Sequence, residues 1–333
     1  MRILAVLCLT VTSAAGVRAQ VDADMVAKRR LFSPIGPGLK QIREGSDGKI
    51  YVLASPFPGL VVYSSDARRL LTMHEAAGLS EAALAEAKAS GEVLVQFGED
   101  CDVDADGTIY IADRPANAVQ VYSKEGRNLR TVSVGEPLSV AALPEGEVAV
   151  ATMRQSALVK VFDKNSRLVR EFGDPEPLTD RQELNRFLNI GELASDAQGH
   201  LYYGFPYFPE PTVRQYDRFG YAGQDVHYAA VEAMQEATAM RHEIEKQERR
   251  GNAPHFKQVM TAMGVDKLTG EIWMAMGSAL LRFDKEGNRR AMYRLYTPHN
   301  ARLEATAIVI EKNRLIIGGD PLGVFEFERL DLK

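Results

Sequence analysis

A short motif, a polar–glycine turn followed by about six β-favouring residues, occurs six times and constrains the fold more than any other feature of the sequence. The copies are DGKIYVLA at 47–54, DGTIYIAD at 106–113, EGEVAVAT at 145–152, QGHLYYGF at 198–205, TGEIWMAM at 269–276 and KNRLIIGG at 312–319. An aromatic residue follows each turn by 13 to 17 residues, at Tyr63, Tyr122, Phe162, Tyr216, Phe283 and Phe327. This regular spacing indicates one structural unit repeated six times.

Each unit contains four predicted strands, because one strand precedes the turn, two lie between the turn and the aromatic residue, and a fourth follows it. Four antiparallel strands repeated about every 40 residues are typical of a β-propeller. The strand after each turn is apolar on both faces, as in Ile109, Tyr110 and Ile111, so it has to be covered on both sides. We therefore predict an all-β fold, a six-bladed β-propeller with four-stranded antiparallel blades and helical insertions between blades.

The propeller is predicted to form one domain over residues 20–333. The chain ends almost directly after the third strand of the sixth unit, so that blade lacks an outer strand of its own. The segment VAKRRLF at 26–32 is the candidate for this strand. Such a closure would also cover an exposed strand edge.

The stretch at 104–113, DADGTIYIAD, resembles the repeat motif of the NHL-repeat six-bladed propellers. The resemblance extends over about 39–333 and is strongest in two or three blades. It implies the six-bladed fold. Propellers of this kind include protein-binding and RNA-binding modules, lyases and lactonase-like enzymes, so the resemblance implies no single activity.

Residues 1–19 have the pattern of a secretory signal peptide. Arg2 precedes a short apolar run, and Val17-Arg18-Ala19 fits the small-x-small pattern of a cleavage site before Gln20. The apolar run is shorter than the roughly 18 residues that a membrane anchor requires. We therefore expect an exported protein, periplasmic or extracellular after cleavage, with no membrane insertion of the mature chain.

Charge and cysteine content restrict the partners and the cross-links of the mature chain. Cleavage removes Arg2 and Arg18 and no acidic residue, so the formal charge changes from −5 to −7. This acidity argues against nucleic acid as a partner. Cleavage also removes Cys8, and Cys101 is then the remaining thiol, which excludes an intramolecular disulfide.

The stretch DVDADGTIYIAD at 102–113 has the acid spacing of a calcium-binding EF-hand loop. An EF-hand requires a helix on each side of the loop, whereas the residues from Thr108 onward are predicted to form a strand. Aspartate–glycine turns also recur in this chain without the full set of acids. We therefore interpret the motif as a hairpin turn, for which Asp-Gly is favoured.

The long connections predict where a functional site lies. The segments at 78–90, 177–188 and 225–252 join successive blades and read as helices. Connections between blades emerge on the same face as the loops between the second and third strands of each blade. Functional residues concentrate on loops held by a rigid scaffold. We therefore place the candidate site on this helix-bearing face.

Seven residues on this face are predicted to bind a ligand. Arg114 and Arg154, from neighbouring blades, could clamp an anion, because guanidinium groups match carboxylates and phosphates. An ion pair with a nearby acid such as Asp113 is the alternative for each arginine, and packing against the helix predicted at 225–252 is the alternative for the aromatic residues. The full predicted set is Asp113, Arg114, Arg154, Tyr203, Phe205, Tyr207 and Asp320.

No metal ligand is assigned from the sequence. Most of the histidines lie between blades, and three of them, His74, His255 and His299, are the candidates for a zinc site. No H-x-H or H-E-x-x-H spacing supports such a site. We expect no cofactor, with zinc or calcium as the alternative.

The predicted function is non-catalytic binding of an unknown protein or a small anionic ligand on the helix-bearing face. The alternative is a metal-dependent lyase or lactonase-like hydrolase with its site at the channel mouth. A purely structural module in a larger assembly is a third possibility. No nucleophile or phosphate-binding motif favours catalysis, so both an enzyme and a non-enzyme are considered and the non-enzyme is preferred.

Overall fold

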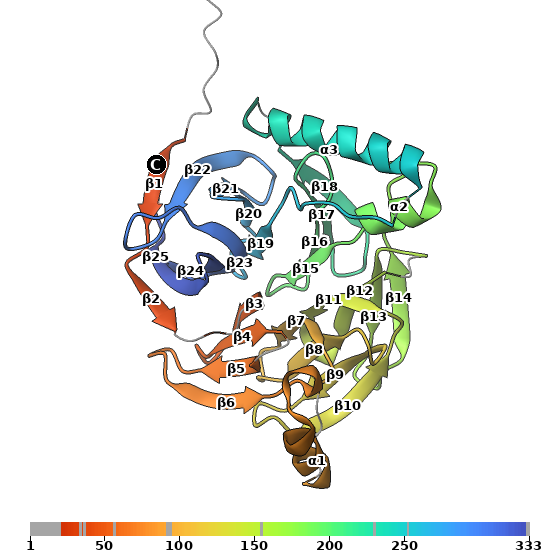
Figure 1. Ribbon diagram of the computed structural model, residues 1–333, viewed down its shortest axis with the longest axis vertical. Helices are drawn as coiled ribbons and strands as arrows, with labels where there is room; N and C mark the ends of the chain where they lie inside the picture. Colours follow the sequence, from red (N-terminus) through yellow and green to blue (C-terminus); the bar gives the residue numbers. More distant parts are fainter. Residues whose placement is uncertain are drawn as a thin grey trace, which may run out of the picture.

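Figure 1 shows a wheel of β-sheets around a central axis; the sheets are six in number, and the fold-class prediction is confirmed. The computed structural model describes residues 21–330, apart from 33–34, 36–37, 56–57, 91–94, 154–155, 229–230 and 252. The predicted signal peptide at 1–19 lies outside the described residues.

The first three blades each consist of four consecutive antiparallel strands. Blade 1 contains β3 (Leu39–Glu44), β4 (Ile50–Ala54), β5 (Gly59–Tyr63) and β6 (Arg69–Met73). Blade 2 contains β7 (Gly98–Val103), β8 (Ile109–Asp113), β9 (Ala118–Tyr122) and β10 (Asn128–Ser133). Blade 3 contains β11 (Pro137–Ala142), β12 (Val148–Thr152), β13 (Val159–Phe162) and β14 (Leu168–Phe172).

The last three blades include the N-terminal strands. Blade 4 contains β15 (Glu192–Ser195), β16 (Leu201–Phe205), β17 (Thr212–Tyr216) and β18 (Ala222–His227). Blade 5 contains β19 (Ala262–Val265), β20 (Ile272–Met276), β21 (Ala279–Phe283), β22 (Arg289–Tyr296) and β1 (Ala23–Val26). Blade 6 contains β23 (Glu304–Ile310), β24 (Arg314–Asp320), β25 (Gly323–Glu328) and β2 (Arg29–Phe32).

The N-terminal segment joins two blades. Strand β2 pairs antiparallel with β25 and is the outer strand of blade 6, within the segment 26–32. Strand β1 pairs in parallel with β22 and adds a fifth strand to blade 5, which the sequence analysis did not predict. Lys28, between the two strands, donates its backbone N–H to Glu326 at 2.7 Å. The first described residues therefore connect the last two blades.

The core consists of apolar clusters between neighbouring blades. One such cluster, between blades 1 and 2, contains Tyr51, Leu53, Ile109 and Ile111. Equivalent clusters lie at each of the other five blade junctions. The middle strands are buried on both faces, as predicted from their composition. The packing that builds each blade therefore also joins it to its neighbours.

The Asp-Gly turns are held by their own aspartates. The Oδ1 atom of Asp104 accepts the backbone N–H groups of Asp106 at 2.9 Å and of Thr108 at 2.8 Å. Gly107 has a φ of +83°, in the left-handed region that glycine adopts without strain. Asp163 forms the same pair of bonds in blade 3. The carboxylate that suggested a calcium loop is therefore used to shape a hairpin.

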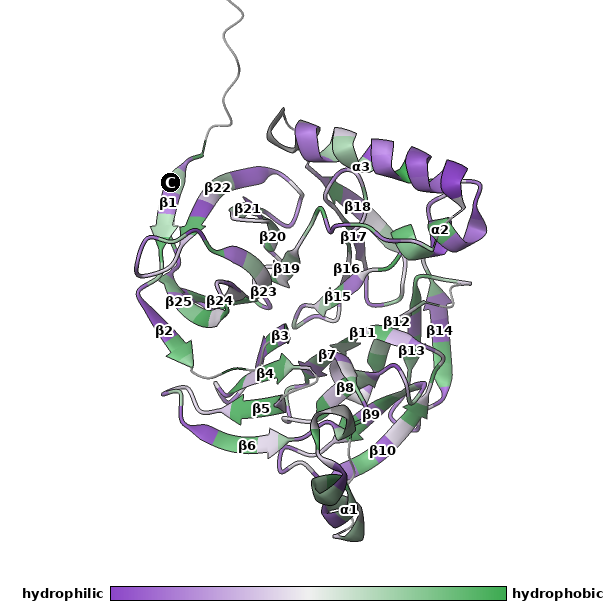
Figure 2. Cartoon of the chain, viewed as in Figure 1, coloured by the Kyte–Doolittle hydropathy of each residue, from purple (hydrophilic) through white to green (hydrophobic). Residues whose placement is uncertain are grey.

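Three α-helices lie in the connections between blades. They are α1 (Glu81–Ala89), α2 (Gln182–Leu188) and α3 (Val231–Arg250), and the short 3-10 helices η1 (Ala76–Gly78) and η2 (Pro144–Gly146) complete the described elements. Helices α2 and α3 pack on each other through Leu184, Leu188, Met240 and Ile244. Figure 2 shows hydrophilic and hydrophobic residues alternating along α3. No helix in the described ranges has the length and apolar character needed to span a membrane.

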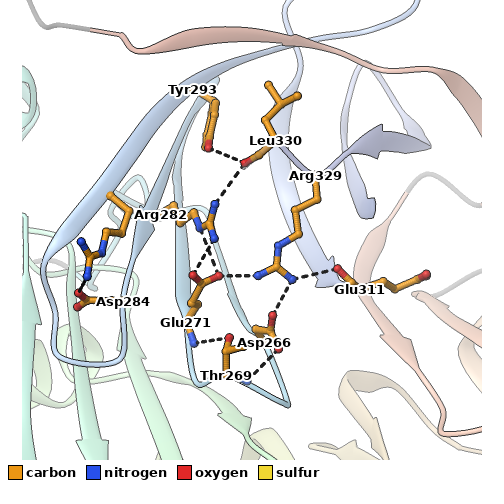
Figure 3. Close-up of polar contacts among 10 residues, drawn as sticks. Asp266, Thr269, Glu271, Arg282, Asp284, Tyr293, Glu311, Arg329 and Leu330 are labelled. Atoms are coloured by element: carbon orange, nitrogen blue, oxygen red, sulfur yellow. Dashed lines mark hydrogen bonds and ion pairs between the residues drawn. The ribbon is translucent and has the colours of Figure 1, made fainter. Parts of the chain in front are cut away.

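A cluster of charges at the end of β25 connects blade 6 to blade 5 (Figure 3). Arg329 forms ion pairs with Asp266 at 2.6 Å and with Glu271 at 2.5 Å, and its Nη1 also donates to the backbone carbonyl of Glu311. Arg282 shares Glu271 and donates to the carbonyl of Leu330 at 3.2 Å. The C-terminal end of the last blade is therefore attached to its neighbour by buried ion pairs.

Candidate functional site

The two ends of the channel differ because the innermost strands of the blades all run in the same direction. The residues at which these strands begin, such as Leu39, Glu99, Leu138 and Glu192, line a cavity of about 550 Å³. We call this end the mouth face and the cavity the mouth cavity. The connections that carry α1, α2 and α3 precede innermost strands and belong to the mouth face. The opposite end, formed by the tight hairpins, is the turn face.

Aromatic and polar side chains line the mouth cavity together. Phe97, Phe187 and Tyr207 supply the aromatic surface, and Phe187 and Tyr207 contact each other with ring centroids 4.7 Å apart. The other polar and charged lining side chains are Lys40, Gln41, Glu99, Asp100, Arg114, Ser139, Glu192, Gln258, Thr261 and Thr306. A concave surface with a few convergent polar groups is the usual form of a ligand site.

Two cations share one carboxylate at the rim of the mouth cavity. Glu99 pairs with the Nζ of Lys40 at 2.5 Å and with the Nε of Arg114 at 2.8 Å. The Nζ of Lys40 also lies 4.4 Å from the ring centre of Phe97. Within the described ranges, the two terminal nitrogens of Arg114 have no hydrogen-bond partner, and 42% of its side chain is exposed. The rim therefore offers donors for an additional anion.

An arginine layer, formed by Arg43, Asp100 and Asp102, lies below the mouth cavity. The guanidinium of Arg43 lies 3.5 Å from a carboxylate oxygen of each aspartate. Burial alone would lower the pKa of Arg43, but Asp100 and Asp102 raise it above its usual value. The layer lies between the mouth cavity and a cavity of about 330 Å³ on the turn face, which Arg43 and Asp102 line.

Both aspartates of the layer also hold neighbouring blades. Asp100 accepts a hydrogen bond from the Ser139 hydroxyl at 2.5 Å and one from the Val140 N–H at 3.1 Å. Asp102 accepts the Ala142 N–H at 2.8 Å. Ser139, Val140 and Ala142 belong to blade 3, so both carboxylates of blade 2 bridge to the next blade. The layer is therefore a structural centre of the wheel as well as the base of the site.

Glu192 lies on the floor of the mouth cavity. It lines the cavity and is otherwise surrounded by protein. One carboxylate oxygen accepts a hydrogen bond from the Gln41 amide at 3.0 Å. Burial raises the pKa of Glu192 to about 7, with Arg43 lowering it and Asp100 raising it further. Glu192 is thus a carboxyl group that changes its charge near neutral pH inside the cavity.

The raised pKa of Glu192 predicts a pH-dependent stability. A carboxyl group whose pKa is higher in the folded state stabilises the fold below the unfolded value of about 4.3 and loses this contribution as the pH rises through 7. We expect the urea midpoint of the wild type to fall more between pH 5 and pH 8 than that of Glu192→Gln. Glu44, whose pKa is also raised to about 7 by burial, acts equally in both proteins. Parallel pH profiles would contradict this prediction.

The structure separates the sequence-predicted site residues. Arg114 and Tyr207 line the mouth cavity. Asp113 is fully buried, and its carboxylate accepts the backbone N–H groups of Gln96 and Phe97, which places it beneath the rim loop rather than in the cavity. Asp320 is exposed at the end of β24, away from the cavity lining. Arg154 lies outside the described residues.

Tyr203 and Phe205 belong to the core rather than to the cavity. Both are fully buried between blades 3 and 4. The hydroxyl of Tyr203 donates to the backbone carbonyl of Asn189 at 2.8 Å, and Phe205 stacks on Phe208 with ring centroids 4.0 Å apart. The aromatic surface predicted for the site is supplied instead by Tyr207, with two rings that the sequence analysis did not select.

The candidate histidines do not form a cluster. His74, His255 and His299 are all exposed. Over the described part of the chain, no group of three or more histidine, cysteine, aspartate and glutamate side chains is arranged to hold a metal ion. Among the described residues, these three histidines are therefore not part of a group that could hold a metal ion.

The site residues that sequence reasoning missed lie on the innermost strands. Gln41 and Arg43 in β3, and Asp100 and Asp102 in β7, alternate with apolar residues and therefore face the channel. Polar residues at alternate positions of a strand that precedes a tight turn were the available signal. The innermost strands therefore supply much of the candidate site, in addition to the loops of the mouth face.

The fold and the cavity define the class of protein, a six-bladed β-propeller with a polar cavity at the mouth face. Searches found no matching family profile and no matching curated protein. Solved structures do match. Streptogramin B lyase is similar over 93% of this chain and 89% of its own, with a TM-score of 0.52 and 12% identity.

Two further structures support the same fold. A catalytically inactive virginiamycin B lyase from Staphylococcus aureus, solved with quinupristin, matches with a TM-score of 0.51 and 11% identity over 87% of this chain and 84% of its own. A chain of the mitotic checkpoint complex matches with a TM-score of 0.54 and 11% identity over 99% of both chains. These similarities establish the propeller and assign no activity, because an enzyme and an assembly component share the architecture.

Proposed function

We propose that this protein is an exported, non-catalytic binding propeller that holds a small anionic ligand, free or as part of a partner protein, in the mouth cavity. The observation that carries the proposal is the pair of cations at the rim, Lys40 and Arg114, which share the single carboxylate of Glu99. The two cations exceed the single carboxylate by one, so the rim has a net positive charge. The signal-peptide pattern of residues 1–19 supports export.

The geometry of Arg114 supports a carboxylate or phosphate as the bound group. Its Nε is used by Glu99, and the two terminal nitrogens are available on the cavity side. A guanidinium group offers such nitrogens in a planar arrangement that matches an oxyanion. The rings of Phe97, Phe187 and Tyr207 would contact an apolar part of the same ligand.

Arg114→Ala is expected to weaken the binding of 3-phenylpropionate by about 10- to 100-fold, since hydrogen bonds to charged groups contribute about 1.5–3 kcal/mol. Isothermal titration calorimetry measures this loss. The matched control is Arg127→Ala, in the β9–β10 hairpin on the turn face, whose side chain is 82% exposed. The control should bind like the wild type. Equal affinity of Arg114→Ala and the wild type, or equal affinity for uncharged 3-phenylpropanol, would refute the anion site.

One observation favours the second candidate function, a lyase or hydrolase with its site at the mouth. Glu192 has a pKa of about 7 and lies in the cavity, which suits a general acid or base. The metal-dependent form predicts stoichiometric zinc or calcium in the purified protein. Loss of that metal in His255→Ala or His299→Ala would support this form, and metal-free protein would exclude it.

A further inference from the structure

The mouth cavity carries opposite charges at its two depths. At the rim, Lys40 and Arg114 exceed the single carboxylate of Glu99 by one positive charge. On the floor, Asp100 already has Ser139, Val140 and Arg43 as partners. Glu192 accepts hydrogen bonds from the Gln41 amide and from the Met263 backbone, which leaves lone pairs of its carboxylate for a donor in the cavity. A ligand whose only charged group is an anion at the rim would leave the Glu192 carboxylate on the floor without a cationic partner.

Two threonine hydroxyls add acceptors on the wall of the mouth cavity. Thr306 uses its hydroxyl hydrogen on the backbone carbonyl of Gly318 at 3.3 Å, and Thr261 directs its own toward the carbonyl of Ala275 at 3.5 Å. Both residues line the cavity. A hydroxyl group has one hydrogen and two lone pairs, so each of these side chains can accept a hydrogen bond from an N–H donor of an occupant. The matching chemical group is one with several N–H donors.

The size of the mouth cavity limits the length of the occupant. A volume of about 550 Å³ corresponds to a sphere about 10 Å across. An extended peptide spans about 3.3–3.6 Å per residue. Two or three residues therefore extend from the rim to the floor. The rings of Phe97, Phe187 and Tyr207 provide room for one apolar side chain.

We propose that the mouth cavity binds a short zwitterionic peptide of two or three residues, with its terminal carboxylate on Arg114 and Lys40 and its terminal ammonium group on Glu192, assisted by the hydroxyls of Thr261 and Thr306. The inference rests on the proposed function, because the same rim cations hold the carboxylate. It adds the second anchor, the direction of the ligand and its length.

Isothermal titration calorimetry at pH 7 with the dipeptide Ala-Phe and its two capped forms separates the anchors. N-acetylation removes the cation, and C-amidation removes the anion. We expect each cap to weaken binding to the wild type at least tenfold. Glu192→Gln should lose the sensitivity to N-acetylation and keep the sensitivity to C-amidation. Arg114→Ala should show the reverse pattern.

Matched controls come from one hairpin on the turn face. Glu125→Gln and Arg127→Ala remove the same charges from the β9–β10 turn, where both side chains are more than half exposed, and should leave all affinities unchanged. Thermal unfolding followed by circular dichroism shows whether each variant is folded. A variant that does not fold is replaced by Thr306→Val, which removes one acceptor of the ammonium group and should weaken Ala-Phe more than its N-acetylated form.

The affinity for Ala-Phe should also rise between pH 5.5 and pH 7. Glu192 faces Arg43 from β3 and Asp100 from β7, and burial raises its pKa to about 7. The ammonium ligand prefers the ionised carboxylate, whereas the peptide amine, with a pKa of about 7.7–8.0, stays protonated over this range. Glu192→Gln should lack this dependence.

The outcomes distinguish the two proposals. If acetylated and free Ala-Phe bind the wild type equally while the amidated form binds weakly, the zwitterion inference is wrong and the anion site stands. If amidation has no effect, or if no form binds at millimolar concentration, the proposed function fails and the inference fails with it.

Discussion

Replacing Arg43 with alanine is expected to lower the free energy of unfolding by about 3–5 kcal/mol, the usual range when one partner of a buried ion pair is removed. Asp100 and Asp102, each 4% exposed in the wild type, would lose the cation that offsets their charge. Both carboxylates are also held in place by backbone N–H groups of blade 3. They cannot move into solvent without breaking the contact between blades 2 and 3.

Urea unfolding of Arg43→Ala, Arg43→Lys and Arg127→Ala measures this effect. The lysine variant keeps a positive charge and should lose less than the alanine variant. The exposed Arg127 should contribute only tenths of a kcal/mol, as surface pairs do. A loss below about 1 kcal/mol in Arg43→Ala would show that the channel is hydrated well enough to stabilise both aspartates, contrary to the burial argument.

The stability deficit of Arg43→Ala should depend on pH in a defined direction. Burial raises the pKa of Asp100, and Arg43 opposes that rise. Without Arg43 the pKa of Asp100 rises further, so the folded variant takes up a proton that the unfolded chain releases. A buried carboxyl group with a raised pKa in the folded state destabilises the fold less at low pH, because it is then protonated and uncharged. The difference between the variant and the wild type should therefore be smaller at pH 5 than at pH 8.

Arg329→Ala is the second substitution with a large expected effect, a loss of about 3 kcal/mol or more in the free energy of unfolding. Its side chain is 9% exposed and neutralises Asp266 and Glu271 in the turn before β20 (Figure 3). Arg282 would still neutralise Glu271, but Asp266 would lose its ion pair. The link between the last two blades would then depend on apolar packing and on the N-terminal strands.

The control for this substitution is Arg290→Ala, since Arg290 pairs with Asp284 in a hairpin of blade 5 and the Arg290 side chain is 60% exposed. Chemical unfolding should show a change below 1 kcal/mol in the control. Burial by itself would raise the pKa of Asp266, but Arg329 and the N–H groups of Leu268 and Thr269 bring it below the usual value. That contribution is complete above the unfolded pKa of about 3.9 and is lost as the pH falls below it. A difference between Arg329→Ala and the wild type that stays constant down to pH 2 would contradict this assignment.

The sequence was sufficient for the wheel, because the information that specifies a blade is local. An Asp-Gly turn, a strand that is apolar on both faces and an aromatic residue at a regular distance lie within one stretch of chain, and each can be interpreted without knowing its neighbours. The resemblance to NHL-repeat propellers supported the same six-bladed fold. The parallel strand β1 was missed, since ADMV at 23–26 has no turn or partner nearby in the sequence that would indicate its pairing with β22.

The candidate site could be predicted only in part. Arg114 and Tyr207, which were selected because they follow strand ends on the mouth face, line the mouth cavity. Tyr203 and Phe205 were assigned to the same surface, but the pleat of β16 and the packing of the adjacent loop bury them. The residues that complete the cavity, such as Lys40, Glu99 and Glu192, come from three different blades.

The number of blades, the composition of each strand and the face that carries the helices follow from the sequence alone, because they depend on periodicity and on the order of elements along the chain. The arginine layer, the raised pKa of Glu192 and the charge at each depth of the mouth cavity were decided by the tertiary structure. These properties depend on distances between side chains that are about 60 to 150 positions apart in the chain, and on how completely water is removed around them. No local pattern encodes either quantity, because both exist only once the six sheets have closed around a common channel.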